Sequence, residues 1–129
     1  MSVHLITGAG SGIGSVVARR LLDRGDQVVV LARDAGRAKE ITAALPGASA
    51  IGGDLAQPGR LSWALSKQAL PERIDSLIHA AGVVDLGPVA DLAANLWERQ
   101  LAVNLVGPAE LTRLLLPLLR VSGARVVFC

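Results

Sequence analysis

The sequence predicts an α/β fold built on a doubly wound parallel sheet, and two observations support this prediction. Short runs rich in valine, isoleucine and leucine alternate with longer segments whose apolar residues recur at helical spacing. The apolar runs show little alternation with polar residues, which is typical of strands covered by helices on both faces. Repeated strand–helix–strand units then imply right-handed crossovers and a ligand site at the carboxyl ends of the strands.

Five strands are expected, and the third is the weakest because it consists mainly of small residues. They cover Val3–Ile6, Gln27–Leu31, Ala48–Ile51, Ile74–His79 and Arg125–Cys129. No internal repeat or low-complexity linker interrupts them, so residues 1–129 are expected to form a single nucleotide-binding domain.

The first helix is predicted directly after the first strand. Ile13, Val16, Val17 and Leu21 share one face of it and are expected to point inward, and Gly25 is placed to end it. The other helices are predicted from similar patterns.

Asp34 is placed to cap the second helix, whose inward positions are Ala38, Ile41 and Leu45. The third helix is expected to begin near Pro58.

Two helical segments are predicted late in the chain, at Asp91–Val106 and Pro108–Leu119. Pro108 indicates either a break between them or one long bent helix.

Composition excludes several classes of protein. Hydrophobic residues make up 51% and charged residues 19% of the chain, which is a globular balance. The net charge of +2 and the scattered basic residues do not favour a nucleic-acid partner. The single cysteine excludes an internal disulfide and a cysteine-based metal cluster. The N-terminus resembles no targeting signal and no apolar run is long enough to span a bilayer, so we expect a cytoplasmic protein without membrane contact or metal.

A glycine-rich turn, Thr7–Gly14, joins the first strand to the first helix. Glycines in such a turn permit positive φ, let a pyrophosphate approach the backbone and allow close packing of helix on strand. The following helix offers free N–H groups to phosphates. A purely structural turn is the alternative, whereas the absence of a Lys-Ser/Thr pair argues against a P-loop.

Ordered motifs resemble the short-chain dehydrogenase/reductase family in its "classical" form. They are Thr7–Gly14, with glycines at 8, 12 and 14, followed by Gly53–Leu55, Ile74–Gly82, Val103–Gly107 and Arg125–Cys129. In the fourth-strand motif His79 and Ala80 stand where the family has two asparagines. The resemblance implies a Rossmann fold of which this chain covers the N-terminal, cofactor-binding portion.

The resemblance also implies a set of site residues. Asp54 would contact the adenine, the backbone at 80–82 would line the adenosine ribose, and Asn104 occupies the family's proton-relay position. The expected cofactor-binding residues are Gly8, Ser11, Gly12, Ile13, Gly14, Arg33, Asp54, Leu55, Ala80, Ala81, Gly82 and Val103.

The end of the second strand predicts which dinucleotide is preferred. An NAD site places an acid there for the ribose 2′-OH, whereas a basic residue accommodates the 2′-phosphate of NADP. Ala32 is not acidic, and Arg33 lies 19 positions beyond Gly14. Because capping explains the neighbouring Asp34, the sequence favours NADP(H) over NAD(H), with a plain surface role for Arg33 as the alternative.

The family's catalytic residues cannot be assigned. A serine after the fifth strand and a Tyr-x-x-x-Lys pair are expected in the family, but this chain ends on that strand and contains no tyrosine. We therefore expect a fragment of a longer carbonyl/alcohol oxidoreductase or a truncated gene product, inactive by itself. The alternative is a small inactive dinucleotide-binding module. Apolar surface left bare by such a half-fold is expected to drive association with itself or with a missing C-terminal portion.

Overall fold

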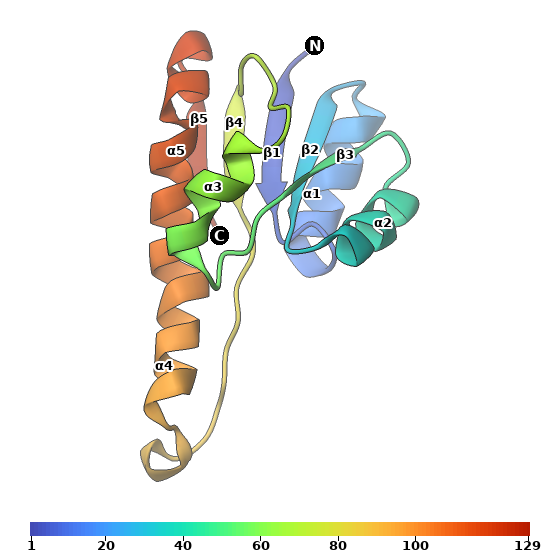
Figure 1. The fold of residues 1–129 in the computed structure, drawn as a ribbon. Coiled ribbons are helices and arrows are strands. Elements are labelled where there is room, and N and C mark those ends of the chain that lie inside the picture. Colours follow the sequence, from blue (N-terminus) through green and yellow to red (C-terminus); the bar gives the residue numbers. More distant parts are fainter.

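The computed structural model describes residues 1–129 and shows one five-stranded parallel sheet with helices on both faces (Figure 1). The strand order is β3-β2-β1-β4-β5, with every pair parallel. The strands are Val3–Thr7 (β1), Gln27–Ala32 (β2), Ser49–Gly52 (β3), Ser76–His79 (β4) and Arg125–Phe128 (β5). The predicted Rossmann-like fold class and all five strands are therefore confirmed.

Helices fill the intervals between the strands. They are Gly12–Asp23 (α1), Ala35–Ala44 (α2), Leu61–Ser66 (α3), Ala94–Leu101 (α4) and Gly107–Ser122 (α5), with short 3-10 turns at Pro58–Arg60 (η1) and Val89–Asp91 (η2) and a π-helical turn at Ala102–Val106 (η3). β4 begins two residues later than predicted, because the N–H of the buried Ile74 donates to the Leu118 carbonyl (3.2 Å) rather than to a neighbouring strand.

The two faces of the sheet carry separate apolar cores. Leu5 and Leu77 pack with side chains of α3 and α5, whereas Ile6, Val28 and Val30 pack with α1 and α2. The division follows the alternation of side chains along each strand. Figure 1 shows α3 and α5 on one side of the sheet and α1 and α2 on the other.

The predicted inward face of α1 is half right, because Leu21 is buried and Val17 packs against the core, whereas Ile13 and Val16 do not. Ile13 and Val16 are 66% and 47% exposed, and the buried residues of this helix are Gly14, Ala18 and Leu21. Two of these are small, and small residues let a helix approach a sheet closely. Ile13 and Val16 consequently lie away from the buried side of the helix.

The late helical segments form one continuous helix, as the second alternative at Pro108 predicted. The helix runs from Ala94 to Ser122, with the π-helical turn η3 immediately before Gly107. By length and composition alone it could cross a membrane, but Leu111 and Leu115 lie fully buried in the core. Core helices pass the same test, so this finding is weak support for a membrane span.

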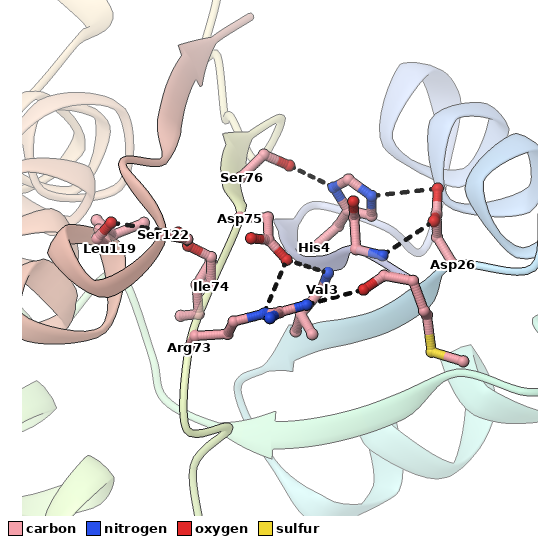
Figure 2. A network of polar contacts seen from close by, with 11 residues as sticks. Val3, His4, Asp26, Arg73, Ile74, Asp75, Ser76, Leu119 and Ser122 are labelled. Carbon is pink, nitrogen blue, oxygen red and sulfur yellow. Dashed lines mark hydrogen bonds and ion pairs between the residues drawn. The ribbon is translucent and has the colours of Figure 1, made fainter.

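Polar contacts fasten the chain at the amino end of the sheet (Figure 2). The Asp26 carboxylate accepts the Ser2 N–H (3.2 Å) and lies 3.4 Å from Nε2 of His4. The Ser2 N–H, more than any other contact, holds the pKa of Asp26 below its ordinary value. Asp75 accepts the Val3 N–H (2.7 Å), so two carboxylates tie the start of β1 to the starts of β2 and β4.

Candidate functional site

A cleft of about 420 Å³ opens at the carboxyl ends of the strands. The chain proceeds from β1 to β2 and β3 on one side and returns to β4 on the other, so the strand order reverses beside β1. Clefts at such switch points bind ligands in open α/β sheets, and this volume suits a small molecule. The lining residues are Thr7, Gly8, Leu31, Ala32, Arg33, Arg37, Ile41, Gly53, Asp54, Leu55, Ala56, Ala81, Gly82, Val83, Arg99 and Val103.

Two glycines of the turn at 7–14 are required by close approach of backbone to backbone. Gly8 has φ of +69°, and a Cβ there would lie 2.5 Å from the Ala81 nitrogen. A Cβ on Gly14 would collide with the carbonyl group of Gly8. These positions therefore fix the turn against α1 and the end of β4.

Gly12 differs, because its φ is +54° but a Cβ there would meet nothing within 4 Å. The open space in front of it adjoins the first turn of α1. Ser11 occupies the N-cap position without a side-chain hydrogen bond to the helix. The N–H groups of Gly12, Ile13 and Gly14 have no intrahelical acceptor, as in the first turn of any helix. This arrangement fits a pyrophosphate, which such N–H groups bind readily.

Thr7 joins the ends of β1 and β4, a role that the sequence did not reveal. Its buried hydroxyl accepts the Ala81 N–H (3.2 Å), and its carbonyl accepts the Ala80 N–H (3.3 Å). Ala80 consequently lies behind Gly8 rather than in the cleft, whereas Ala81 and Gly82 line the cleft.

Asn104 lies in the π-helical turn η3 and is fully engaged with one backbone unit. Its Oδ1 accepts the Val83 N–H (2.8 Å), and its Nδ2 donates to the Val83 carbonyl (2.7 Å). The side chain therefore fixes the helix to the segment after β4, while its neighbour Val103 lines the cleft. Irregular π turns of this kind often mark functional sites.

His79, at the end of β4, is 3% exposed and stacks on Phe128 with ring centroids 4.7 Å apart. Its Nε2 lies 2.8 Å from the hydroxyl oxygen of Thr112, and that hydroxyl donates to the Pro108 carbonyl. Because a hydroxyl has only one hydrogen, His79 must be the donor in the first bond. Its Nδ1 is left buried without a partner. Burial lowers the pKa of His79, so the structure favours a neutral imidazole in a structural position.

The rim of the cleft beyond β2 carries the polar side chains. Asp34 accepts the Arg37 N–H (2.7 Å) through one carboxylate oxygen, which confirms the predicted helix cap. The other carboxylate oxygen of Asp34 lies 3.6 Å from Nε of Arg33. Asp54 uses one oxygen to accept the Ala56 N–H (2.9 Å). Arg37 lines the same cleft and was not predicted. Its place in the first turn of the helix that directly follows β2 is the signal that could have found it.

The structure brings some of the expected residues together and separates others. Those that line the cleft together are Gly8, Arg33, Asp54, Leu55, Ala81, Gly82 and Val103. Those that lie beside it, at the start of α1 or behind the turn, are Ser11, Gly12, Ile13, Gly14, Ala80 and Asn104.

The parallel sheet, the switch-point cleft and the glycine turn opening a helix define a Rossmann-type nucleotide-binding protein. The sequence profile of the family described as short chain dehydrogenase matches residues 2–129. The chain belongs to this family, whose members are oxidoreductases that use nicotinamide dinucleotides.

Individual relatives agree with this assignment. The short chain dehydrogenase ausX of Emericella nidulans is 35% identical over 127 residues, which are 95% of this chain and 63% of that protein. A short-chain dehydrogenase from Streptomyces avermitilis superimposes with a TM-score of 0.79 at 32% identity, covering 98% of this chain and 48% of the other. The Pseudomonas aeruginosa RhlG/NADP active-site complex gives the same TM-score and identity, covering 98% and 53%. The chain thus spans between about half and two thirds of the length of these relatives.

Proposed function

We propose that residues 1–129 act as a single NADP(H)-binding domain. The pyrophosphate would lie at the free N–H groups of α1, in front of Gly12, where a Cβ would meet open space. The adenosine would enter the cleft, with Asp54 and Leu55 on one side and Ala81 and Gly82 on the other. The observation that supports this most directly is that these residues meet in one cleft at the switch point, beside an uncapped helix start.

The groups at the end of β2 support the proposed preference for NADP(H) over NAD(H). Ala32 supplies no carboxylate for a ribose 2′-OH, and Asp34 is engaged in capping α2. Arg33 lines the cleft, is mostly exposed and has only the 3.6 Å contact with Asp34 to neutralise it. A guanidinium is suited to bind a phosphate through paired hydrogen bonds, so it favours the cofactor that carries a 2′-phosphate.

The test is to replace Arg33 by alanine and to measure the dissociation constants of NADPH and NADH by fluorescence titration. Loss of charge-assisted hydrogen bonds is expected to weaken NADPH binding by about tenfold or more. NADH binding is expected to stay within about twofold, since it has no phosphate to lose. Equal weakening of both cofactors, or of neither, would contradict the proposal.

In the whole protein, the bound dinucleotide would exchange a hydride with a carbonyl or alcohol substrate. In this chain, Asn104 fixes the helix beside the cleft, and Val103 closes one wall of it. No tyrosine is available within the 129 residues to supply the proton. We therefore propose that this stretch alone binds the cofactor without turnover, and that an inactive binding module is the second candidate function. Measurable dehydrogenase turnover by the purified 129-residue chain would contradict this.

We further propose that the protein is cytoplasmic and has no nucleic-acid or membrane partner. It is also proposed to associate with further copies of itself. Val127 and Phe128 of β5 are 44% and 64% exposed, which supports association with a further copy or with the remainder of a longer chain. Large exposed apolar side chains of this kind favour protein contacts. Sedimentation of the purified chain at tens of micromolar tests this, and a single monomeric species would contradict it.

A further inference from the structure

Arg37 lies across the glycine turn, in the space that a side chain at position 10 would take. Gly10 has no positive φ, so its backbone does not require glycine. The nearest atoms to a Cβ on Gly10 would all belong to the guanidinium of Arg37, with its central carbon 2.9 Å away. Unlike Gly8 and Gly14, which face backbone, Gly10 therefore makes room for one side chain.

The Arg37 guanidinium is held by an acid one helical turn ahead. Its Nη1 lies 2.8 Å from a carboxylate oxygen of Glu40, and its backbone N–H is held by Asp34. The Glu40 side chain is 69% exposed and that of Arg37 is 38% exposed. An ion pair so open to solvent contributes little free energy, so exchanging its anion for another costs little.

Arg33 and Arg37 border the same cleft, and each lies beside a carboxylate of its own segment. The two guanidiniums come from the end of β2 and the first turn of α2, with the glycine turn opposite Arg37. The cleft is thus lined by two arginines, each paired with an exposed acid.

We propose that Arg37 is a second cation for the adenosine 2′-phosphate and that Glu40 is an internal competitor for it. This inference rests on the proposed NADP(H) function. Binding moves the guanidinium of Arg37 from the Glu40 carboxylate to the phosphate, which carries more negative charge and more acceptor oxygens. A ligand without the 2′-phosphate leaves the Arg37–Glu40 pair in place. Gly10 is the specificity-determining position that keeps this space open.

The test compares 2′,5′-ADP with 5′-AMP by isothermal titration calorimetry, so that the readout is binding alone. Arg37→Ala is expected to weaken 2′,5′-ADP about tenfold and to leave 5′-AMP within about twofold. Glu40→Gln is expected to tighten 2′,5′-ADP by about two- to fivefold, because an exposed pair no longer competes.

The matched control is Glu110→Gln, since Glu110 pairs with Arg113 at the same i,i+3 spacing on α5 and neither residue lines the cleft. It removes the same charge and is expected to leave both ligands unchanged, which separates local competition from net charge. Gly10→Ala is expected to weaken the binding of 2′,5′-ADP but not that of 5′-AMP. The Gly10→Ala/Arg37→Ala double variant is expected to bind 2′,5′-ADP as weakly as Arg37→Ala alone.

The outcomes separate this inference from the proposed function. If the parent chain binds both ligands equally, the NADP(H) preference fails and this inference fails with it. If Arg33→Ala abolishes a preference that Arg37→Ala and Glu40→Gln leave intact, only the role of Arg37 is wrong. If Glu40→Gln and Glu110→Gln raised the affinity for 2′,5′-ADP equally, Glu40 would not be a local competitor for Arg37. Thermal midpoints close to the parent's confirm that each exposed substitution leaves the fold intact.

Discussion

The two ends of the parallel sheet use polar residues in opposite ways. At the amino end, carboxylates and a histidine bond to the chain itself: Asp26 to Ser2, Asp75 to Val3, and His4 to Ser76 at 2.6 Å (Figure 2). At the carboxyl end, the first N–H groups of α1 have no partner within the helix, and Arg33 has only a long contact with an exposed acid.

This difference distinguishes structural polar groups from groups available to a ligand. Buried or half-buried polar groups are normally bonded in a folded chain, and the amino end meets most of that requirement internally, with Nε2 of His4 and Oδ2 of Asp26 facing each other in an ion contact of 3.4 Å. The carboxyl end keeps its cations in the cleft and its free N–H donors beside it, where a phosphate could satisfy them. Substitutions at the amino end should therefore change stability, and those around the cleft should change binding.

Gly8 is an exception to this division, because it lies at the carboxyl end but is needed for the close approach of two backbone segments. Gly8→Ala combines a positive φ with a Cβ 2.6 Å from the Ala80 carbonyl oxygen, and is expected to lower the free energy of unfolding by about 2–5 kcal/mol. Gly12→Ala, with positive φ but open space, is the matched control and is expected to lower it by only about 1–2 kcal/mol. Urea unfolding measures both, and equal losses would contradict the steric explanation.

Asp75 sharpens the comparison from the other end. Val3 is only 8% exposed, and Asp75→Ala removes the acceptor of its N–H. The substitution is expected to lower the free energy of unfolding by about 1–3 kcal/mol. Binding of 2′,5′-ADP by the folded protein is expected to stay unchanged. Arg33→Ala should give the reverse result, with lost binding and unchanged stability. If either variant changed both quantities strongly, the two ends would not be separable.

Much of the fold could be predicted because its signals are local. The valine-rich run at 27–32 is buried from Val28 onward, and the Asp34 cap involves only residues three apart in the chain. The glycine turn could also be predicted, because positive φ and close approach leave a recognisable residue type.

The remaining features depend on contacts between distant segments. The exposed face of α1, with Ile13 and Val16, was mispredicted because the close approach of Gly14 to Gly8 decides which side of the helix meets the sheet. Arg37 was missed because its position depends on the space above Gly10, which hydrophobic periodicity does not report. Helix periodicity likewise could not predict that Asn104 bonds to Val83 rather than to solvent.

The smallest expected effect comes from His79, the one buried histidine at the carboxyl end. Burial lowers its pKa below the ordinary value of 6.5, so the unfolded chain takes up the proton first as the pH falls. The contribution of His79 to the free energy of unfolding is therefore fully present above pH 6.5 and declines below it. For one proton, the slope is at most about 1.4 kcal/mol per pH unit.

His79→Asn removes this proton uptake, and its free energy of unfolding should fall less steeply than the parent's between pH 6.5 and pH 5. His4→Gln is the matched control, because it removes the other histidine and leaves the buried one in place. The measurement is urea unfolding at each pH. A His79→Asn chain that keeps the parent's slope, while His4→Gln loses it, would show that the amino end carries the pH dependence.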